Sequence, residues 1–465
     1  MKPIRTILLA CLLFSVHLFA ATAKPSPNIV FILTDDQRWN TLGCMGDTNI
    51  VTPHIDRLAR EGVLFRNHFV TTSICCCSRA SIFTGQYVRR HGIGDFTTPF
   101  TTAQWAQTYP ALLRKHGYYT GFIGKFGVGN DKAVNAMADQ FDYWKGVPGQ
   151  GGKYFIDPQD PSRTHETKKF GDDALEFIGR APTNQPFCLS LSFTAPHARD
   201  SLPHNNQYTP DDRDKPLYTD LVLPKPVTDN SNYFDKLPKF VQAESTVSRE
   251  RYHWRFDTTQ KYELNAKNYY RLISGIDREV GRIMAELEQR GLATNTVIIY
   301  TSDNGYFLGD RELSDKFYMY EEGLRDPLII FDPREPADDR GRTEDAMTLN
   351  IDFAPTMLAL AGINPPARMQ GCSLIPLINN EYPADWRREF FYEEHFFPKR
   401  IPPSEGVRTG RWSYIRWVNE KPPLEELFDL RADPLEAHNL ANSPAYAPKL
   451  AQLRTQWAKY RKELK

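Results

Sequence analysis

Short runs of consecutive apolar residues alternate with amphipathic segments along most of the chain. Four runs of β-branched and apolar residues predict buried strands, at 28–34, 119–123, 187–193 and 296–301. Helical periodicity and capping residues predict helices between them, at 52–61, 108–116 and 264–290. Strands that alternate with helices predict an α/β fold, in which a large, mostly parallel sheet is sandwiched by helices.

Polar residues follow three of these predicted strands. Asp35 and Asp36 come directly after the first, His197 follows the third, and Asp303 and Asn304 follow the fourth. Because ligands in open α/β sheets bind beyond the carboxyl ends of the strands, we expect these side chains to converge. Taken singly, each residue has an ordinary interpretation, since Asp-Asn-Gly favours a turn and an isolated histidine can be a capping residue.

Two further regions lack the alternation of predicted strands and helices. Residues 200–262 are polar with weak periodicity, which predicts a long surface excursion that covers the site. Beyond residue 375, short β-type runs and a final helical segment predict a smaller α+β subdomain with an antiparallel sheet, its elements at 390–393, 406–408, 412–417, 426–430 and 445–464. The predicted organisation is a leader at 1–23, a catalytic α/β domain at 24–375 and a C-terminal subdomain at 376–465.

The first 23 residues have the form of a secretory signal peptide. Lys2 and Arg5 precede an apolar stretch, and Ala21-Thr22-Ala23 matches a cleavage signal. A membrane anchor is the alternative, but the stretch is short for a span of about 20 residues. We therefore expect a periplasmic or secreted protein that has no membrane attachment after cleavage.

The charge balance limits the class of partner. The chain of 465 residues carries 57 Lys and Arg and 57 Asp and Glu, and removal of the leader leaves a net charge of −2. This balance argues against a nucleic-acid binder with a broad basic field, but it leaves room for an anion bound at one local site.

The cysteines do not form an evident framework. Six follow the leader, at positions 44, 75, 76, 77, 188 and 372. Three adjacent cysteines cannot easily reach disulfide geometry with one another, and no second ligand pair with zinc spacing lies nearby. The run Cys75-Cys76-Cys77 therefore needs another explanation.

The segment 73–85, SICCCSRASIFTG, supplies that explanation. Cys75-x-Cys77-Ser78-Arg79, followed by Thr84-Gly85, resembles the signature of the type I sulfatase family, C-x-P/A-S-R with a nearby T-G. The resemblance implies that a maturation enzyme oxidises Cys75 to formylglycine and that Arg79 stabilises the product. Cys77 stands where the family usually has Pro or Ala.

Other elements match the family in the same order between about residues 27 and 441. They are Asp35-Asp36, Gly124-Lys125, Ala195-Pro196-His197, Asp303-Asn304-Gly305, Lys316, and the C-terminal residues Trp412, Tyr414 and 426–441. The resemblance implies an alkaline-phosphatase-like fold and hydrolysis of sulfate esters. The detail around Cys75 and the segment DKFYMYEE resemble the branch that acts on sulfated carbohydrates, such as N-acetylglucosamine-6-sulfatases and algal-polysaccharide sulfatases.

The resemblance also assigns roles, and each role suits the chemistry of its side chain. Asp35, Asp36, Asp303 and Asn304, together with the modified Cys75, form a hard oxygen cage that suits Ca²⁺, or Mg²⁺ if the cage is tighter. The cations Arg79, Lys125 and Lys316 are expected to bind sulfate and the transition state. His197 is expected to protonate the leaving oxygen. A hydrated aldehyde has two hydroxyls, so one can attack sulfur and the other can later expel sulfate.

One departure from the family pattern bears on this chemistry. The family often has a histidine two residues after the Gly-Lys lysine, whereas this chain has Gly127. His91 is a candidate substitute on its proximity in sequence alone. In the C-terminal subdomain, His395, Lys399 and Arg400 are candidates for sugar contacts.

Two competing functions remain open at this point. A phosphomonoesterase or phosphodiesterase on the same scaffold would normally have Ser or Thr as nucleophile and two zinc ions. A non-catalytic binder of sulfated glycans would follow if Cys75 stays unconverted.

Overall fold

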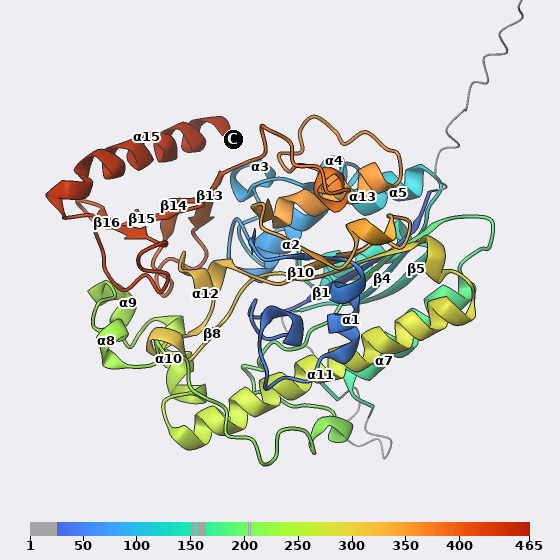
Figure 1. Ribbon diagram of the computed structural model, residues 1–465, viewed down its shortest axis with the longest axis horizontal. Helices are drawn as coiled ribbons and strands as arrows, with labels where there is room; N and C mark the ends of the chain where they lie inside the picture. The colour runs from blue at the N-terminus through green and yellow to red at the C-terminus, as the bar shows by residue number, and fades with distance from the viewer. Residues whose placement is uncertain (1–25, 150–153, 156–163, 203, 205) are drawn as a thin grey trace, which may run out of the picture.

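The structure is a computed structural model that describes residues 26–149, 154–155, 164–202, 204 and 206–465 (Figure 1). An eight-stranded sheet lies at its centre, with strand order β11-β2-β10-β7-β1-β6-β4-β5. The predicted leader at 1–23 lies outside the described residues.

The middle of the sheet consists of the four strands that the apolar runs predict. They are β1 (Asn28–Thr34), β4 (Tyr119–Lys125), β6 (Phe187–Ser192) and β7 (Thr296–Ser302). The pairs β1–β6, β1–β7 and β4–β6 are all parallel, so their carboxyl ends meet at one edge. The prediction of a mostly parallel sheet is confirmed, and the site residues follow the strands at this edge.

The outer strands make the sheet mixed. They are β2 (Val63–Phe65), β5 (Tyr143–Val147), β10 (Leu328–Phe331) and β11 (Arg342–Glu344). Strand β10 runs antiparallel to both of its neighbours, β2 and β7. Two small parallel strands, β3 (His68–Phe69) and β12 (Thr348–Leu349), pair separately beside the main sheet.

Helices cover both faces of the sheet, and alternation along β1 shows why (Figure 1). Val30 and Ile32 pack in one core cluster, whereas Ile29, Phe31 and Leu33 pack in another. The first cluster lies under α1 (Pro53–Glu61), α7 (Glu166–Arg180) and α11 (Thr259–Gln289). The second lies under α2 (Cys75–Thr84), α5 (Tyr109–Lys115) and α13 (Phe353–Leu360). Short helices complete the layers: α3 (Val88–His91), α4 (Thr102–Trp105), α6 (Asp131–Asn135) and α14 (Ile375–Ile378).

The polar region at 200–262 differs from its prediction. It contains α8 (Ser231–Phe234), α9 (Lys239–Gln242) and α10 (Val247–Arg255), and it buries Tyr208 and Arg255 completely. The interpretation as a surface excursion was wrong for these residues, because their polar groups are satisfied inside. The Arg255 side chain donates to Gln207 Oε1 at 2.7 Å and to Asp315 Oδ1 at 3.1 Å.

A separate four-stranded antiparallel sheet forms the C-terminal part (Figure 1). Its strands are β13 (Glu389–Glu394), β14 (Ser404–Thr409), β15 (Trp412–Trp417) and β16 (Leu424–Asp429), and α15 (Ala447–Glu463) covers it. The predicted antiparallel sheet and closing helix are confirmed, while the boundary at residue 375 stays a prediction.

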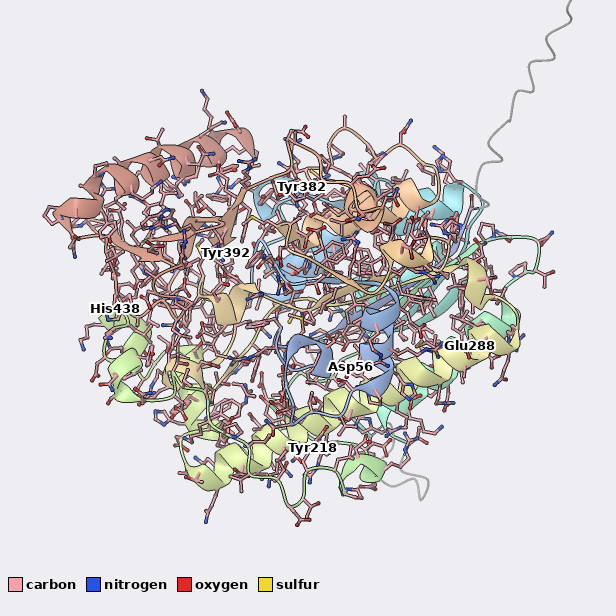
Figure 2. The ribbon with its side chains drawn as sticks, viewed as in Figure 1. Asp56, Tyr218, Glu288, Tyr382, Tyr392 and His438 are labelled. Atoms are coloured by element: carbon pink, nitrogen blue, oxygen red, sulfur yellow. The ribbon has the colours of Figure 1, made fainter. Side chains whose placement is uncertain are left out.

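Tyr392 of β13, labelled in Figure 2, joins this sheet to two segments outside the large sheet. Its hydroxyl donates to the carbonyl of Phe317 at 2.7 Å and accepts from the amide of Ser73 at 3.4 Å. These two segments precede α2 and follow Lys316, so the C-terminal sheet supports the backbone around the site. No helix within the described ranges combines the length and apolar character that crossing a membrane requires.

Candidate active site

The polar residues at the three strand ends converge, as the sequence predicts. The amide of Asp303 donates to the carbonyl of Thr34 at 3.1 Å, and the amide of Asp35 donates to the carbonyl of Ala195 at 3.2 Å. Asp36, held in the left-handed region at φ 63°, donates its amide to Asp303 Oδ1 at 3.2 Å. These bonds extend the parallel pairing beyond the strands, so Asp35, Asp36 and Asp303 gather in one fully buried cluster.

Cys75 is the first residue of α2 and faces the carboxylates. Its Sγ lies 3.3 Å from Asp35 Oδ1 and 4.0 Å from Asp36 Oδ1. Burial raises the pKa of the Cys75 thiol well above its usual value, and the nearby Asp303 carboxylate raises it further. Residue 75 also lies at the positive end of a ten-residue helix, which favours an anion there.

The two neighbouring cysteines have a packing role. Cys76 and Cys77 are buried in an apolar cluster with Ile74 and Phe69, and their sulfurs lie 3.7 Å apart. All six cysteines in the described part of the chain are free. Of the run of three, Cys75 alone makes a side-chain contact with the carboxylates among the described residues, and the other two behave as small apolar groups.

Arg79 lies one turn after Cys75 on α2 and is fully enclosed. Its guanidinium donates to Asp303 Oδ2 at 2.8 Å, to the Lys125 carbonyl at 2.7 Å and to Ser192 Oγ at 2.5 Å. Burial lowers the pKa of Arg79, but Asp303 and Asp35 outweigh this and leave the pKa raised. Arg79 therefore stays charged and joins α2 to three strand ends.

Lys125 and Lys316 are both buried, and each contacts a different aspartate. Lys125 Nζ forms an ion pair with Asp35, and Lys316 Nζ donates to both oxygens of Asp36, at 2.6 and 2.7 Å. For both lysines burial lowers the pKa, and the aspartate partner more than reverses it. Position 124 has no room for a side chain, because a Cβ there would lie 1.9 Å from the carbonyl oxygen of Ser192.

His197 completes the cluster from the segment after β6. Its Nε2 lies 3.5 Å from Asp36 Oδ2, and its Nδ1 lies 2.5 Å from the carbonyl oxygen of Ala198. Burial lowers the pKa of His197 well below its usual value, and Lys316 and Lys125 lower it further. In the neutral ring Nδ1–H donates to the carbonyl, which leaves the Nε2 lone pair directed at the site.

The donor set fits a divalent cation. Asp35, Asp36, Cys75 and His197 each offer a ligand atom, and these atoms all lie within 4.8 Å of one another. Asn304 Oδ1 is buried beside them and has no hydrogen-bond partner among the described residues. Burial and the charge of Asp303 raise the pKa of Asp35 to about 6, and the nearby Lys125 and Arg79 offset only part of this rise. Carboxylate and amide oxygens are the ligands that hard cations prefer.

Gly127 and His91 occupy positions that the sequence alone does not explain. Gly127 has φ 76°, and a Cβ there would lie 2.4 Å from Cδ of Arg79. The arginine stem thus fills the space where a side chain at 127 would begin. The ring of His91 contacts Ser81 Oγ at 3.1 Å and the amide of Ile93 at 3.0 Å, and it makes no contact with the cluster among the described residues. Burial lowers the pKa of His91 to about 3, and its ring contacts join α2 to the residues that follow α3.

The three candidate sugar-contact residues follow β13 and lie apart from the cluster. His395 is 48% exposed and lies 3.2 Å from Glu405, while Arg400 forms an ion pair with Glu250 at 2.8 Å. Lys399 is exposed. None of the three contacts the Cys75 cluster within the part of the chain that the structure describes, so their role in sugar binding stays a prediction.

Several supporting residues escaped the sequence reasoning. Tyr269 donates its hydroxyl to the Asp36 carbonyl at 2.7 Å, and Ser192 accepts from Arg79. Asp315, next to Lys316, pairs with Arg251 at 2.6 Å. In the sequence, the one signal for Asp315 is its position next to Lys316. Its partner Arg251 and the residue Tyr269 come from helices whose packing cannot be derived from the sequence.

Comparison with known proteins identifies the fold and family. Residues 27–363 match the sulfatase family model, and residues 309–463 match the model of the N-sulphoglucosamine sulphohydrolase C-terminal region. An N-acetylglucosamine-6-O-sulfatase of Bacteroides thetaiotaomicron is 31% identical, over 92% of this chain and 85% of that protein. An ulvan-active sulfatase of Formosa agariphila is 28% identical, over 90% of this chain and 78% of that protein.

A solved structure supports the same conclusion. A protein in complex with its substrate, D-glucosamine-2-N,6-O-disulfate, superposes with a TM-score of 0.81 at 28% identity, covering 94% of this chain and 98% of that one. The fold is thus alkaline-phosphatase-like, and the chain belongs to the sulfatase family. It is a sulfuric ester hydrolase, and membership of this family implies a divalent metal and a formylglycine in general.

Proposed function

We propose that this enzyme removes sulfate from a sulfated carbohydrate, with formylglycine at position 75 as nucleophile and Ca²⁺ as the metal. The observation that carries the proposal is the position of Cys75. Its Sγ lies 3.3 Å from Asp35 at the start of α2, within a cluster that contains three buried cations. An anion such as sulfate needs cations, and a nucleophile needs to lie beside them.

Residue 75 acts as the hydrated aldehyde. One hydroxyl oxygen attacks sulfur, the bond from sulfur to the sugar oxygen breaks, and residue 75 carries the sulfate as an ester. The second hydroxyl then gives its proton to the neutral Nε2 of His197, the carbon–oxygen bond to sulfate breaks with its electron pair staying on sulfate, and the aldehyde forms again. A serine or cysteine side chain has no second hydroxyl and would retain the sulfate.

His197 supplies the proton that the leaving sugar oxygen takes. Its Nδ1 is committed to the Ala198 carbonyl at 2.5 Å, so Nε2 is the atom that faces the site. A single free nitrogen with a fixed orientation suits a general acid. The ring is neutral in the free site, so Nε2 first takes the proton that the attacking hydroxyl of residue 75 releases and then donates it to the leaving oxygen.

The three cations divide the remaining work. Arg79 fixes residue 75 relative to Asp303, and Lys125 and Lys316 neutralise the charge that develops on the transferring sulfate. Asp35, Asp36, Asp303 and Asn304 would hold Ca²⁺, which supplies Lewis-acid polarisation of a sulfate oxygen. Four oxygen donors with no thiolate favour Ca²⁺ or Mg²⁺ over zinc.

The carbohydrate class rests on relatives and on the sequence branch. The two relatives described above are named for N-acetylglucosamine-6-O-sulfate and for ulvan, and the solved structure contains a sulfated glucosamine. We further propose that residues 1–23 direct export to the periplasm or beyond, and that a formylglycine-generating maturation enzyme acts on Cys75.

Matched esters test the proposal against a phosphatase on the same fold. Protein from a host that matures sulfatases is assayed with an aryl sulfate and the corresponding aryl phosphate, and then with N-acetylglucosamine 6-sulfate. We expect sulfate release to exceed phosphate release, and Cys75→Ser to abolish it while the protein stays folded. Faster phosphate release, or undiminished sulfate release by the variant, would contradict the proposal. Glycan binding without sulfate release by converted protein would indicate a binder instead.

A further inference from the structure

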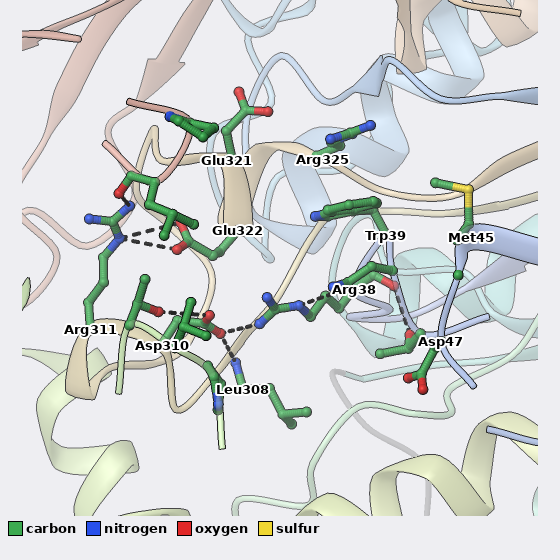
Figure 3. Close-up of a pocket in the computed structure, with 18 of the residues that line it drawn as sticks. Arg38, Trp39, Met45, Asp47, Leu308, Asp310, Arg311, Glu321, Glu322 and Arg325 are labelled. Carbon is green, nitrogen blue, oxygen red and sulfur yellow. Dashed lines mark hydrogen bonds and ion pairs between the residues drawn. The ribbon is translucent and has the colours of Figure 1, made fainter. Parts of the chain in front are cut away.

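Two cavities adjoin along the junction between the large sheet and the C-terminal sheet. Their volumes are about 1060 and 640 Å³, and they share Asn67, Arg408, Gly410 and Arg411. The shared residues belong to the end of β14 and the turn that follows it, apart from Asn67. We call the two cavities together the cationic groove, and Figure 3 shows part of the larger one.

The cationic groove is separate from the candidate active site. None of the residues of the Cys75 cluster lines either cavity. The segment 303–325 nevertheless contributes to both sites. Asp303 and Lys316 belong to the cluster, and Asp310 and Arg325 line the groove. The groove is therefore an additional surface next to the catalytic loops.

The charge of the groove contrasts with that of the chain. Ten Lys and Arg side chains and six Asp and Glu side chains line its two cavities, an excess of four positive charges. The whole chain has a formal net charge of zero. A concentration of one sign in a hollow surface attracts ligands of the opposite sign.

Pairing within the groove leaves part of this charge available. Six of the ten cations have a carboxylate partner, as in the pairs of Arg311 with Glu322 at 3.2 Å and Arg408 with Glu321 at 2.7 Å. The other four have no carboxylate within ion-pair distance among the described residues: Arg325, Arg388, Arg431 and Lys449. Arg388 and Arg431 are exposed to solvent.

Aromatic side chains accompany these cations. The guanidinium of Arg325 lies over the Trp39 ring, with Cζ 3.9 Å from the ring centroid (Figure 3). Tyr382, which lines the smaller cavity, is 57% exposed (Figure 2). Flat rings beside fixed cations suit a ligand that has both apolar ring faces and anionic groups.

We propose that the cationic groove binds a sulfated polysaccharide chain at sugars other than the one that reacts. The groove consists of two adjoining cavities, and cations without a carboxylate partner line both of them, which fits an extended polyanion better than a small ion. Pyranose rings supply the apolar faces that Trp39 and Tyr382 can contact. The inference rests on the proposed carbohydrate substrate, because it assigns a polymeric form to that substrate.

Charge reversal at the two exposed, unpaired arginines tests the groove. The variant Arg388→Glu/Arg431→Glu changes both cavities and breaks no described ion pair. The control Arg60→Glu/Arg368→Glu carries the same change in net charge at two exposed arginines that line neither cavity. Each pair is placed in the Cys75→Ser background, and binding of a heparin octasaccharide is measured by calorimetry at low and at physiological salt.

The two sites give distinguishable results. We expect the groove variant to bind the octasaccharide at least about fivefold more weakly, with a smaller dependence on salt, while the control binds like its parent. In the Cys75 background, turnover of N-acetylglucosamine 6-sulfate should be equal in all three proteins. Equal octasaccharide binding by the two variants, or none by the parent, would overturn the groove proposal. Tighter binding of a single-stranded DNA of equal charge would also overturn it. Absence of sulfate release together with groove-dependent binding would count against the proposed function alone.

Discussion

Gly127 and Arg79 are packed so closely that the arginine side chain occupies the place of a Cβ at position 127. The distance from that Cβ position to Arg79 Cδ would be 2.4 Å. Arg79 in turn fixes Asp303 and the end of β6 through Ser192. The family often has a histidine at position 127. The glycine of this chain leaves the space that the Arg79 side chain occupies.

Substitution of Gly127 tests this packing. Gly127→Ala should displace Arg79 and strain a left-handed backbone, so we expect a loss of about 1–3 kcal/mol in the free energy of unfolding and a drop of about a hundredfold in kcat/KM. Gly92→Ala is the control, because Gly92 has φ 71° and open space around its Cβ position. The assignment would be contradicted if Gly127→Ala kept full activity while Gly92→Ala lost activity.

Arg79→Lys tests the fork geometry of the guanidinium. A lysine cannot reach Asp303, Ser192 and the Lys125 carbonyl together, so buried partners are left unpaired. We expect unfolding to become easier by about 2–4 kcal/mol and sulfate release to fall by two to three orders of magnitude, roughly. Ser192→Ala, which removes one partner, should cost about 1 kcal/mol. Denaturant titration and initial rates measure both, and equal effects of the two changes would argue against a central role for Arg79.

Lys316→Met tests the ion pair between Lys316 and Asp36. The change removes the cation that donates to both oxygens of Asp36, so kcat/KM should fall by about a hundredfold. Lys168→Met removes a half-exposed lysine that pairs with Asp172 on α7 and should leave kcat/KM unchanged. A Lys316→Met enzyme with normal kcat/KM on N-acetylglucosamine 6-sulfate would exclude Lys316 from the chemistry.

Metal removal has a readout independent of activity. A chelator should lower the melting temperature as well as abolish sulfate release, because an ion held at about a hundred times its Kd stabilises the fold by about 2.7 kcal/mol. Ca²⁺ should restore both, and Zn²⁺ should not. Unchanged melting after exhaustive chelation, with activity retained, would show that the Asp35–Asp303 cluster needs no ion.

The sequence predicted the centre of the site well, for a physical reason. Runs such as 28–34 and 296–301 are short, mostly apolar and rich in β-branched residues, so they predict buried strands, and polar residues directly after parallel strands meet at one edge. The six ordered motif elements then fixed which side chains gather there. Asp35, Asp36, Asp303 and Cys75 therefore lie where the pattern required.

Residues that depend on packing between distant segments escaped prediction. Arg255 and Tyr208 lie in a polar stretch that reads as surface, yet they are buried because Asp200, Asp315 and Tyr306 satisfy their polar groups. The cationic groove likewise draws its arginines from segments far apart in the chain, and a balanced overall charge concealed it. The close packing of Gly127 against Arg79 has no local signal at all.

The most direct test of the central claim is the mass of the peptide that contains residue 75. Protein from a host that matures sulfatases is digested without reduction of aldehydes, and the peptide is compared with that of Cys75→Ser. The account predicts an aldehyde, a mass about 18 Da below that of the cysteine peptide, in proportion to sulfate release. An unmodified cysteine in protein that releases sulfate at its full rate would contradict the account.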